Sequence, residues 1–160
     1  MRSMNARRRF LTFSLCSFFL NVLFAAVFAL STGCGGKPRV RCERCGMFLD
    51  ANPRWAAGAV AAGGRDVHFD APRCLFAWLQ STTGIGAEAP WVTEYYTQRK
   101  RPAAFVWYVV GADVTGPMGP DFVPIGDEVG AERFRGEHHA RAVLRYDAVD
   151  AAALARLDAH

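Results

Sequence analysis

The sequence predicts an α+β protein with antiparallel sheet, preceded by a segment for export from the cytoplasm. Three observations carry this prediction. A long apolar run follows an arginine-rich start. Beyond it, short strand patterns and two helix patterns follow one another without a regular β-α-β alternation, which favours α+β over α/β. The order of an extended pair, a short helix and a strand also occurs twice. The roughly 127 residues after position 33 are enough for a well-buried core.

The pattern of residues 1–33 predicts a signal peptide or membrane anchor rather than a part of the fold. Arg7, Arg8 and Arg9 precede the apolar run 10–30, the arrangement of an export signal. About 20 apolar residues would also span a bilayer if they were not removed. In the following STGCGG, Cys34 stands where a bacterial lipoprotein is acylated, and residues 34–41 would then form a lipidated linker. Either reading places the remaining chain at the periplasmic face of a bacterial membrane.

The charge of the exported part is balanced. Four of the 19 basic residues and none of the 15 acidic residues lie in the first 33 positions, which leaves 15 of each sign in the rest of the chain. A neutral domain lacks the basic surface that binding to nucleic acid requires. We therefore expect no nucleic-acid partner.

The first expected lobe comprises residues 42–98. Its elements are a weak strand, a second strand, a helix and a third strand, at residues 56–62, 65–70, 71–80 and 91–96. A turn at Gly63-Gly64 would join the first two. In RDVHFD, Val67 and Phe69 alternate with polar residues, the pattern of a half-buried strand. Asp70 is a good N-cap for the helix that follows.

The second expected lobe comprises residues 103–150, and a loose helical tail follows at 151–160. The run AAFVWYVVG, residues 103–111, is almost wholly apolar and predicts a strand that is buried on both faces. GPMGPDFVPI then reads as a loop and a short extended piece. GDEVGAERFRG predicts a helix that ends at Gly136, and ARAVLRYDAV alternates as a final strand.

The candidate site lies in RCERCGMFLD. Cys42 and Cys45 form a C-x-x-C, and a glycine separates Cys45 from Met47. Soft thiolate and thioether ligands select Cu(I) among biological metals. Met118, set between turn-forming residues in GPMG, supplies a candidate third soft ligand. We therefore expect Cys45, Met47 and Met118 to bind Cu(I), with Cys42 and His68 as further candidates.

Several simpler interpretations of these cysteines, methionines and histidines compete with a copper site. A lone C-x-x-C outside the cytoplasm is often a disulfide or a redox pair. Methionine fills gaps in hydrophobic cores, and either Met47 or Met118 could have that role. His68 lies opposite the apolar face of its strand, where a solvated side chain is the plainer account. Cys74, beside Leu75 on the helix, reads as a buried thiol rather than as a ligand. His138 and His139 read as surface residues.

Together these motifs resemble the NosL family. The resemblance rests on RCERCGMFLD, HFDAPRCLFAWL, WVTEYY and AAFVWYVVGADVTGPMGPDFVPIGDE, which occur in that order between about Cys42 and Tyr146. It implies two small ββα-type, treble-clef-like lobes with Cu(I) bound between them. In the motifs, Cys45 and Met47 match the C-G-M, Met118 matches the second motif, and Cys42 matches the leading cysteine.

The family resemblance implies a metallochaperone rather than an enzyme. It would be anchored to the membrane and would deliver Cu(I) to nitrous oxide reductase, or to its membrane assembly machinery, while the enzyme matures. A related copper enzyme could be the client instead. Two alternatives stay open: a thiol–disulfide protein that uses Cys42 and Cys45, and a structural zinc module, although a second C-x-x-C is missing.

Overall fold

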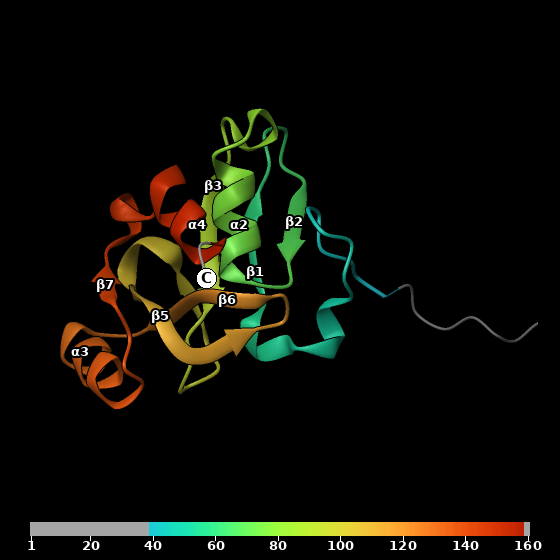
Figure 1. Ribbon diagram of the computed structural model, residues 1–160. Coiled ribbons are helices and arrows are strands. Elements are labelled where there is room, and N and C mark those ends of the chain that lie inside the picture. Colours follow the sequence, from blue (N-terminus) through green and yellow to red (C-terminus); the bar gives the residue numbers. More distant parts are fainter. Residues whose placement is uncertain (1–38, 159–160) are drawn as a thin grey trace, which may run out of the picture. The chain divides into compact units, whose positions relative to one another are not determined.

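The computed structural model describes residues 39–158, which contain three helices and two antiparallel sheets (Figure 1). The predicted α+β class with antiparallel sheet is therefore confirmed. The predicted export segment 1–33 and Cys34 lie outside the described residues. Among the helices that are described, none is long and apolar enough to cross a membrane.

The first sheet has the strand order β2-β1-β3-β4. Its strands are β1 (Ala57–Val60), β2 (Asp66–Phe69), β3 (Glu88–Thr93) and β4 (Lys100–Pro102). β1 pairs with β2 and with β3, so that Ala57 lies opposite both Phe69 and Val92. The predicted hairpin is present, with Gly63 and Gly64 at its turn. Val67 and Phe69 point into the core, as their alternation predicts.

Helix α2 (Pro72–Leu79) follows β2, but its N-terminus differs from the prediction. The N-cap is Ala71, and no side chain of that residue caps the helix. The Asp70 carboxylate accepts a hydrogen bond from the thiol of Cys45 instead, at 3.3 Å. The backbone N–H of Arg73 in the first turn donates to Asp121, which comes from the second sheet, at 2.9 Å. A distant strand thus provides the cap that the sequence assigned to Asp70.

The second sheet has the order β6-β5-β7. Its strands are β5 (Trp107–Gly116), β6 (Gly119–Ile125) and β7 (Ala142–Leu144). β5 begins four residues later than predicted, because Ala103–Phe105 form a 3-10 turn. Within β5, Tyr108 and Val110 pack in one hydrophobic cluster and Val109 packs in the other. This central strand is therefore buried on both faces, as its composition predicts.

The chain repeats one structural unit. β1, β2 and α2 are followed by β3, which pairs with β1; β5, β6 and α3 (Glu128–Glu137) are followed by β7, which pairs with β5. Both units are a hairpin, a helix and a strand that returns beside the first strand of the hairpin. The predicted duplication is thus visible in the topology. The domain boundaries 42–98, 103–150 and 151–160 stay a prediction.

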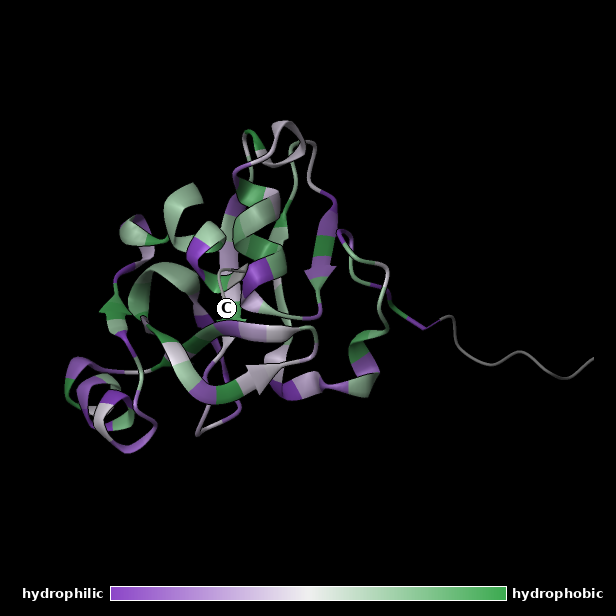
Figure 2. Ribbon diagram, in the orientation of Figure 1, coloured by the Kyte–Doolittle hydropathy of each residue, from purple (hydrophilic) through white to green (hydrophobic). Residues whose placement is uncertain are grey.

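Helix α2 occupies the centre of the packing. It contacts β1 and β2 of the first sheet, β6 of the second, and the C-terminal helix α4 (Ala151–Asp158). Figure 2 shows α2 as largely hydrophobic and α3 as largely hydrophilic. Phe76 of α2 is buried and its ring meets the rings of Tyr108, Phe122 and Tyr146 at 5.0–5.7 Å. This aromatic cluster joins the two repeated units.

Candidate metal centre

Four side chains bring metal-ligating atoms together at the start of α2. The sulfurs of Cys42, Cys45 and Cys74 and a carboxylate oxygen of Asp70 all lie within 4.8 Å of one another. Cys42 and Cys45 come from the turn that precedes β1, Asp70 follows β2, and Cys74 stands in the first turn of α2. All three cysteines are free thiols. The fold thus converts three separate segments into one cluster.

A tight turn positions the C-x-x-C. The N–H of Gly46 donates to the carbonyl of Cys42 at 3.0 Å, and the N–H of Cys42 donates to the carbonyl of Met47 at 2.8 Å. Gly46 has a φ of 77°, in the left-handed region that favours glycine. The N–H of Glu43 donates to the carbonyl of His68 in β2 at 2.9 Å, which fixes the turn to the first sheet. The backbone conformation therefore favours a glycine between Cys45 and Met47.

The thiols differ in their readiness to ionise. The Cys74 thiol, by hydrogen bonding to the sulfur of Cys42, lowers the pKa of Cys42 to about 6. Burial raises the pKa of Cys45 to about 11. The hydrogen bond to Cys42 and burial both raise the pKa of Cys74. Cys42 is thus a thiolate at neutral pH and accepts a hydrogen bond from the Cys74 thiol. The thiolate is the form of cysteine that binds a metal ion.

Asp70 has an oxygen that suits a cation. The side chain is buried, and its Oδ1 accepts the weak hydrogen bond from Cys45. Its Oδ2 is buried without a hydrogen-bond partner among the residues that the structure describes. A buried acceptor left without a donor costs about 1–3 kcal/mol. A positive ion held by the sulfurs would remove that cost, so the donor set fits a metal.

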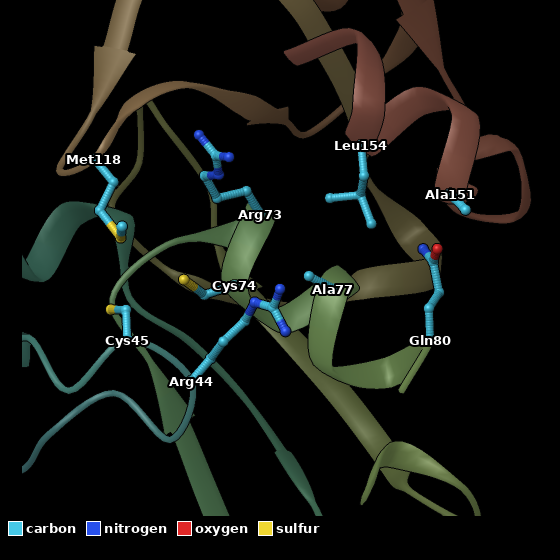
Figure 3. A pocket seen from close by; sticks show the side chains of 9 residues that line it. All are labelled: Arg44, Cys45, Arg73, Cys74, Ala77, Gln80, Met118, Ala151 and Leu154. Carbon is cyan, nitrogen blue, oxygen red and sulfur yellow. The ribbon is translucent and has the colours of Figure 1, made fainter. Parts of the chain in front are cut away.

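Met118 reaches the same place from the second repeated unit. It lies at the turn between β5 and β6, and it is exposed. With Cys45 and Cys74 it lines a pocket of about 670 Å³, whose remaining lining residues are Arg44, Arg73, Ala77, Gln80, Ala151 and Leu154. Figure 3 shows the Met118 side chain extending toward the part of the pocket where Cys45 and Cys74 lie. The pocket is the path by which an ion could reach the thiols.

The predicted site residues are therefore only partly brought together. Cys42 and Cys45 belong to the cluster, and Cys45 and Met118 face one pocket. Met47 is half-buried, its N–H donates to the sulfur of Cys45, and it does not line that pocket. His68 lies on β2 between the inward-facing Val67 and Phe69, and its ring meets Trp91 at 6.1 Å. His68 is thus on the other face of the sheet.

Two residues of the cluster were not among the predicted ligands. Asp70 was expected to cap α2, and Cys74 was expected to be a buried thiol. Cys74 is indeed buried, but its sulfur points to the other thiols. The spacing of an aspartate just before a helix and a cysteine in its first turn is the signal that could have indicated both. Only the folded structure shows that Asp70 and Cys74 lie beside the C-x-x-C.

Fold and cluster together define a class: small α+β proteins with a sulfur-rich centre that could hold a metal ion. The comparisons with known proteins then identify the family. The family model of NosL matches residues 37–154, and the chain therefore belongs to the NosL family.

A solved structure has the same fold. The chain is similar to the copper chaperone NosL from Shewanella denitrificans, with a TM-score of 0.62 and 21% sequence identity. The match covers 71% of this chain and 91% of the other. No curated protein matches the sequence.

Proposed function

We propose that this protein is a copper chaperone that binds Cu(I) at the cluster and passes it to a partner. The observation that carries the proposal is the convergence of three thiols on one point, with the sulfur of an exposed methionine beside their pocket. Thiolate and thioether sulfur prefer Cu(I) among the biological metals. Membership of the NosL family, and the description of the Shewanella protein as a copper chaperone, support the same function.

The arrangement suits transfer better than permanent storage. Cys42 and Cys74 are 3% and 4% exposed, whereas Met118 is 46% exposed. A neutral thioether holds Cu(I) without adding negative charge, and it needs no deprotonation before it binds. An incoming thiolate, imidazole or thioether can replace Met118 first and then take the ion from Cys45. No covalent bond of a substrate is broken in this mechanism.

The proposed destination of the copper is nitrous oxide reductase, reached directly or through its membrane assembly machinery. The predicted export segment supports a place at the periplasmic face of a bacterial membrane, held by a lipid on Cys34 or by the apolar run itself. In a host whose own copy is deleted, wild-type protein should restore nitrous oxide reduction at limiting copper, and Cys45→Ser should not. Full copper loading of the reductase in the deletion strain would overturn this destination.

The copper-binding step is tested by an anaerobic titration. The full chain, reduced and held in detergent, is titrated with Cu(I) against a chromophoric Cu(I) chelator. We expect one tightly held copper per chain, and weaker binding after Cys45→Ser, Met47→Ala or Met118→Ala. Ile85, exposed but outside the pocket, provides the matched control Ile85→Ala, which should bind copper normally. Failure of the wild type to compete with the chelator would refute copper binding.

A zinc site is the second candidate, because three cysteines and one carboxylate are also a ligand set that Zn²⁺ accepts. The two metals make different demands on the site. Zinc needs four closed ligands, so Asp70→Asn should weaken Zn²⁺ binding while Met118→Ala leaves it unchanged. Copper binding should show the opposite dependence on Met118. The same variants therefore decide which ion the centre is built for.

A further inference from the structure

The pocket beside the thiols offers more than a route for a bare ion. We propose that it binds Cu(I) as a complex with a small thiol that carries carboxylates, and that Arg44 and Arg73 recognise those carboxylates. This inference rests on the proposed copper function and names the form in which the copper arrives. The ligand class is a low-molecular-weight anionic thiolate.

The size and chemistry of the pocket match such a ligand. Its volume of about 670 Å³ lies in the usual range for small-molecule sites. Sulfur donors stand at one side, from Cys45, Cys74 and Met118, and the apolar side chains of Ala77 and Leu154 stand at another. An ion alone would need far less space. The surplus volume can hold the co-ligand that remains on the copper until the protein sulfurs replace it.

The charge of the pocket wall favours an anion. Arg44 and Arg73 are the charged residues of the lining, and no acidic side chain accompanies them. The carboxylates of Asp70 and Asp121, near the base of α2, are both buried, and Arg73 interacts electrostatically with Asp121, so that Arg44 carries the larger part of the proposed recognition. Arg73 also donates to the carbonyl of Pro120 at 3.2 Å.

Arg44 lacks the ion pair that three other exposed arginines of the chain form. Arg39, Arg65 and Arg135 each form an ion pair with a nearby carboxylate, namely Asp50, Glu43 and Glu132. Arg44, within residues 39–158, has neither an ion pair nor a side-chain hydrogen bond, and it is exposed at the pocket. Because Arg44 lines the same pocket as Cys45, Cys74 and Met118, its charge lies beside the proposed copper donors. A guanidinium with no internal partner can bind a ligand carboxylate through two parallel hydrogen bonds.

The exchange replaces one Cu(I)–sulfur bond by another, and copper stays in the same oxidation state throughout. A bond forms between the sulfur of Cys45 and Cu(I), and a bond between Cu(I) and the carrier thiolate breaks. The proton of the Cys45 thiol passes to the departing thiolate, which leaves as a thiol. Where the copper carries two thiolates, a second cysteine of the protein displaces the other thiolate in the same way. The arginines hold the complex by its carboxylates while the sulfurs exchange.

Three small carrier thiols of different charge separate charge from sulfur chemistry. Cu(I) is presented anaerobically to the full chain as its complex with mercaptosuccinate, 2-mercaptoethanol or cysteamine, whose substituents are anionic, neutral and cationic. Loading is followed by separating the protein from the carrier on a desalting column at timed intervals after mixing and measuring the copper that elutes with the protein. We expect loading from mercaptosuccinate to be at least about tenfold faster than from 2-mercaptoethanol at low salt, and the advantage to shrink at high salt. Cysteamine should be the slowest.

Substitutions of Arg44 test whether the pocket causes this preference. Arg44→Gln should reduce the advantage of mercaptosuccinate to about threefold or less, and Arg44→Lys should restore most of it. Arg99→Gln removes an exposed charge that does not line the pocket, and it should leave the preference unchanged. Equal loading from the three carriers, or equal slowing of all three by Arg44→Gln, would overturn the inference. Failure to load copper from any carrier would instead refute the copper function.

Discussion

Asp121 is expected to make the stability of the protein depend on pH. It lies on β6, is 2% exposed, and accepts hydrogen bonds from the backbone N–H groups of Arg73 and Phe122 at 2.9 and 2.8 Å. Its Oδ2 is buried without a hydrogen-bond partner in the part of the chain that the structure describes. Burial outweighs the two donors and raises the pKa of Asp121 from 3.8 to about 7.

The sign and size of the effect follow from that pKa. Between pH 4 and pH 7 the folded protein keeps a proton on Asp121 that the unfolded chain has lost. The free energy of unfolding therefore falls as the pH rises through this window, and it is constant above it with respect to this group. A difference of about three pH units at ~1.4 kcal/mol each gives a loss of at most roughly 4 kcal/mol.

Asp121→Asn isolates this contribution. The amide oxygen can accept both backbone hydrogen bonds, and the side chain no longer titrates. Urea unfolding of the reduced, metal-free protein, followed by circular dichroism, gives the free energy of unfolding for both chains at pH 5 and pH 8. Wild type should lose more stability than the variant between these values, by up to about 2.6 kcal/mol, because only the two pH units between pH 5 and the raised pKa of Asp121 contribute. Because other groups titrate equally in both chains, their effects cancel in the comparison. Equal losses would refute the reasoning.

Three further substitutions, one with a matched control, test the packing and the site. Gly58→Ala would place a Cβ 2.7 Å from the ring of Trp91, and it should therefore lower the free energy of unfolding in urea by about 1–3 kcal/mol. Its control is Gly136→Ala, whose Cβ would meet nothing within 4 Å and which should be neutral or stabilising. Phe76→Ala should cost about 3–5 kcal/mol in the same assay, because it removes the ring that joins the two repeated units. Met118→Ala should weaken Cu(I) binding about tenfold or more in chelator competition, yet change the stability of the copper-free protein by no more than about 0.5 kcal/mol, since the residue is exposed. A copper affinity within threefold of wild type would remove Met118 from the site.

Local patterns predicted the elements of the fold well. The alternation of Val67 and Phe69 with polar residues gave β2, and the glycine pair gave its turn. The apolar run gave a central strand buried on both faces, although its first residues form a 3-10 turn. These features depend on neighbours in the sequence. A prediction made from periodicity can therefore identify them.

Contacts between distant segments were not predictable in the same way. Asp121 caps α2 from a strand 48 positions along the chain, and Asp70 faces the thiols instead. Either aspartate could have capped the helix as far as residue type is concerned. Cys74 likewise reads as a core residue by burial alone, and only the position of the C-x-x-C turn beside it makes it a candidate ligand. The cluster is thus a property of the assembled fold.

The two repeated units contribute unequally to the centre, and this asymmetry determines how an ion would leave it. The first unit and the turn before it supply the thiols and Asp70, all held by backbone contacts or by burial. The second unit supplies only Met118, on an exposed turn between two strands. A ligand from a partner can therefore displace the thioether without disturbing the packed cluster. Exchange should proceed from the Met118 side of the pocket, and the deeply buried sulfurs of Cys42 and Cys74 should be the last to release the metal.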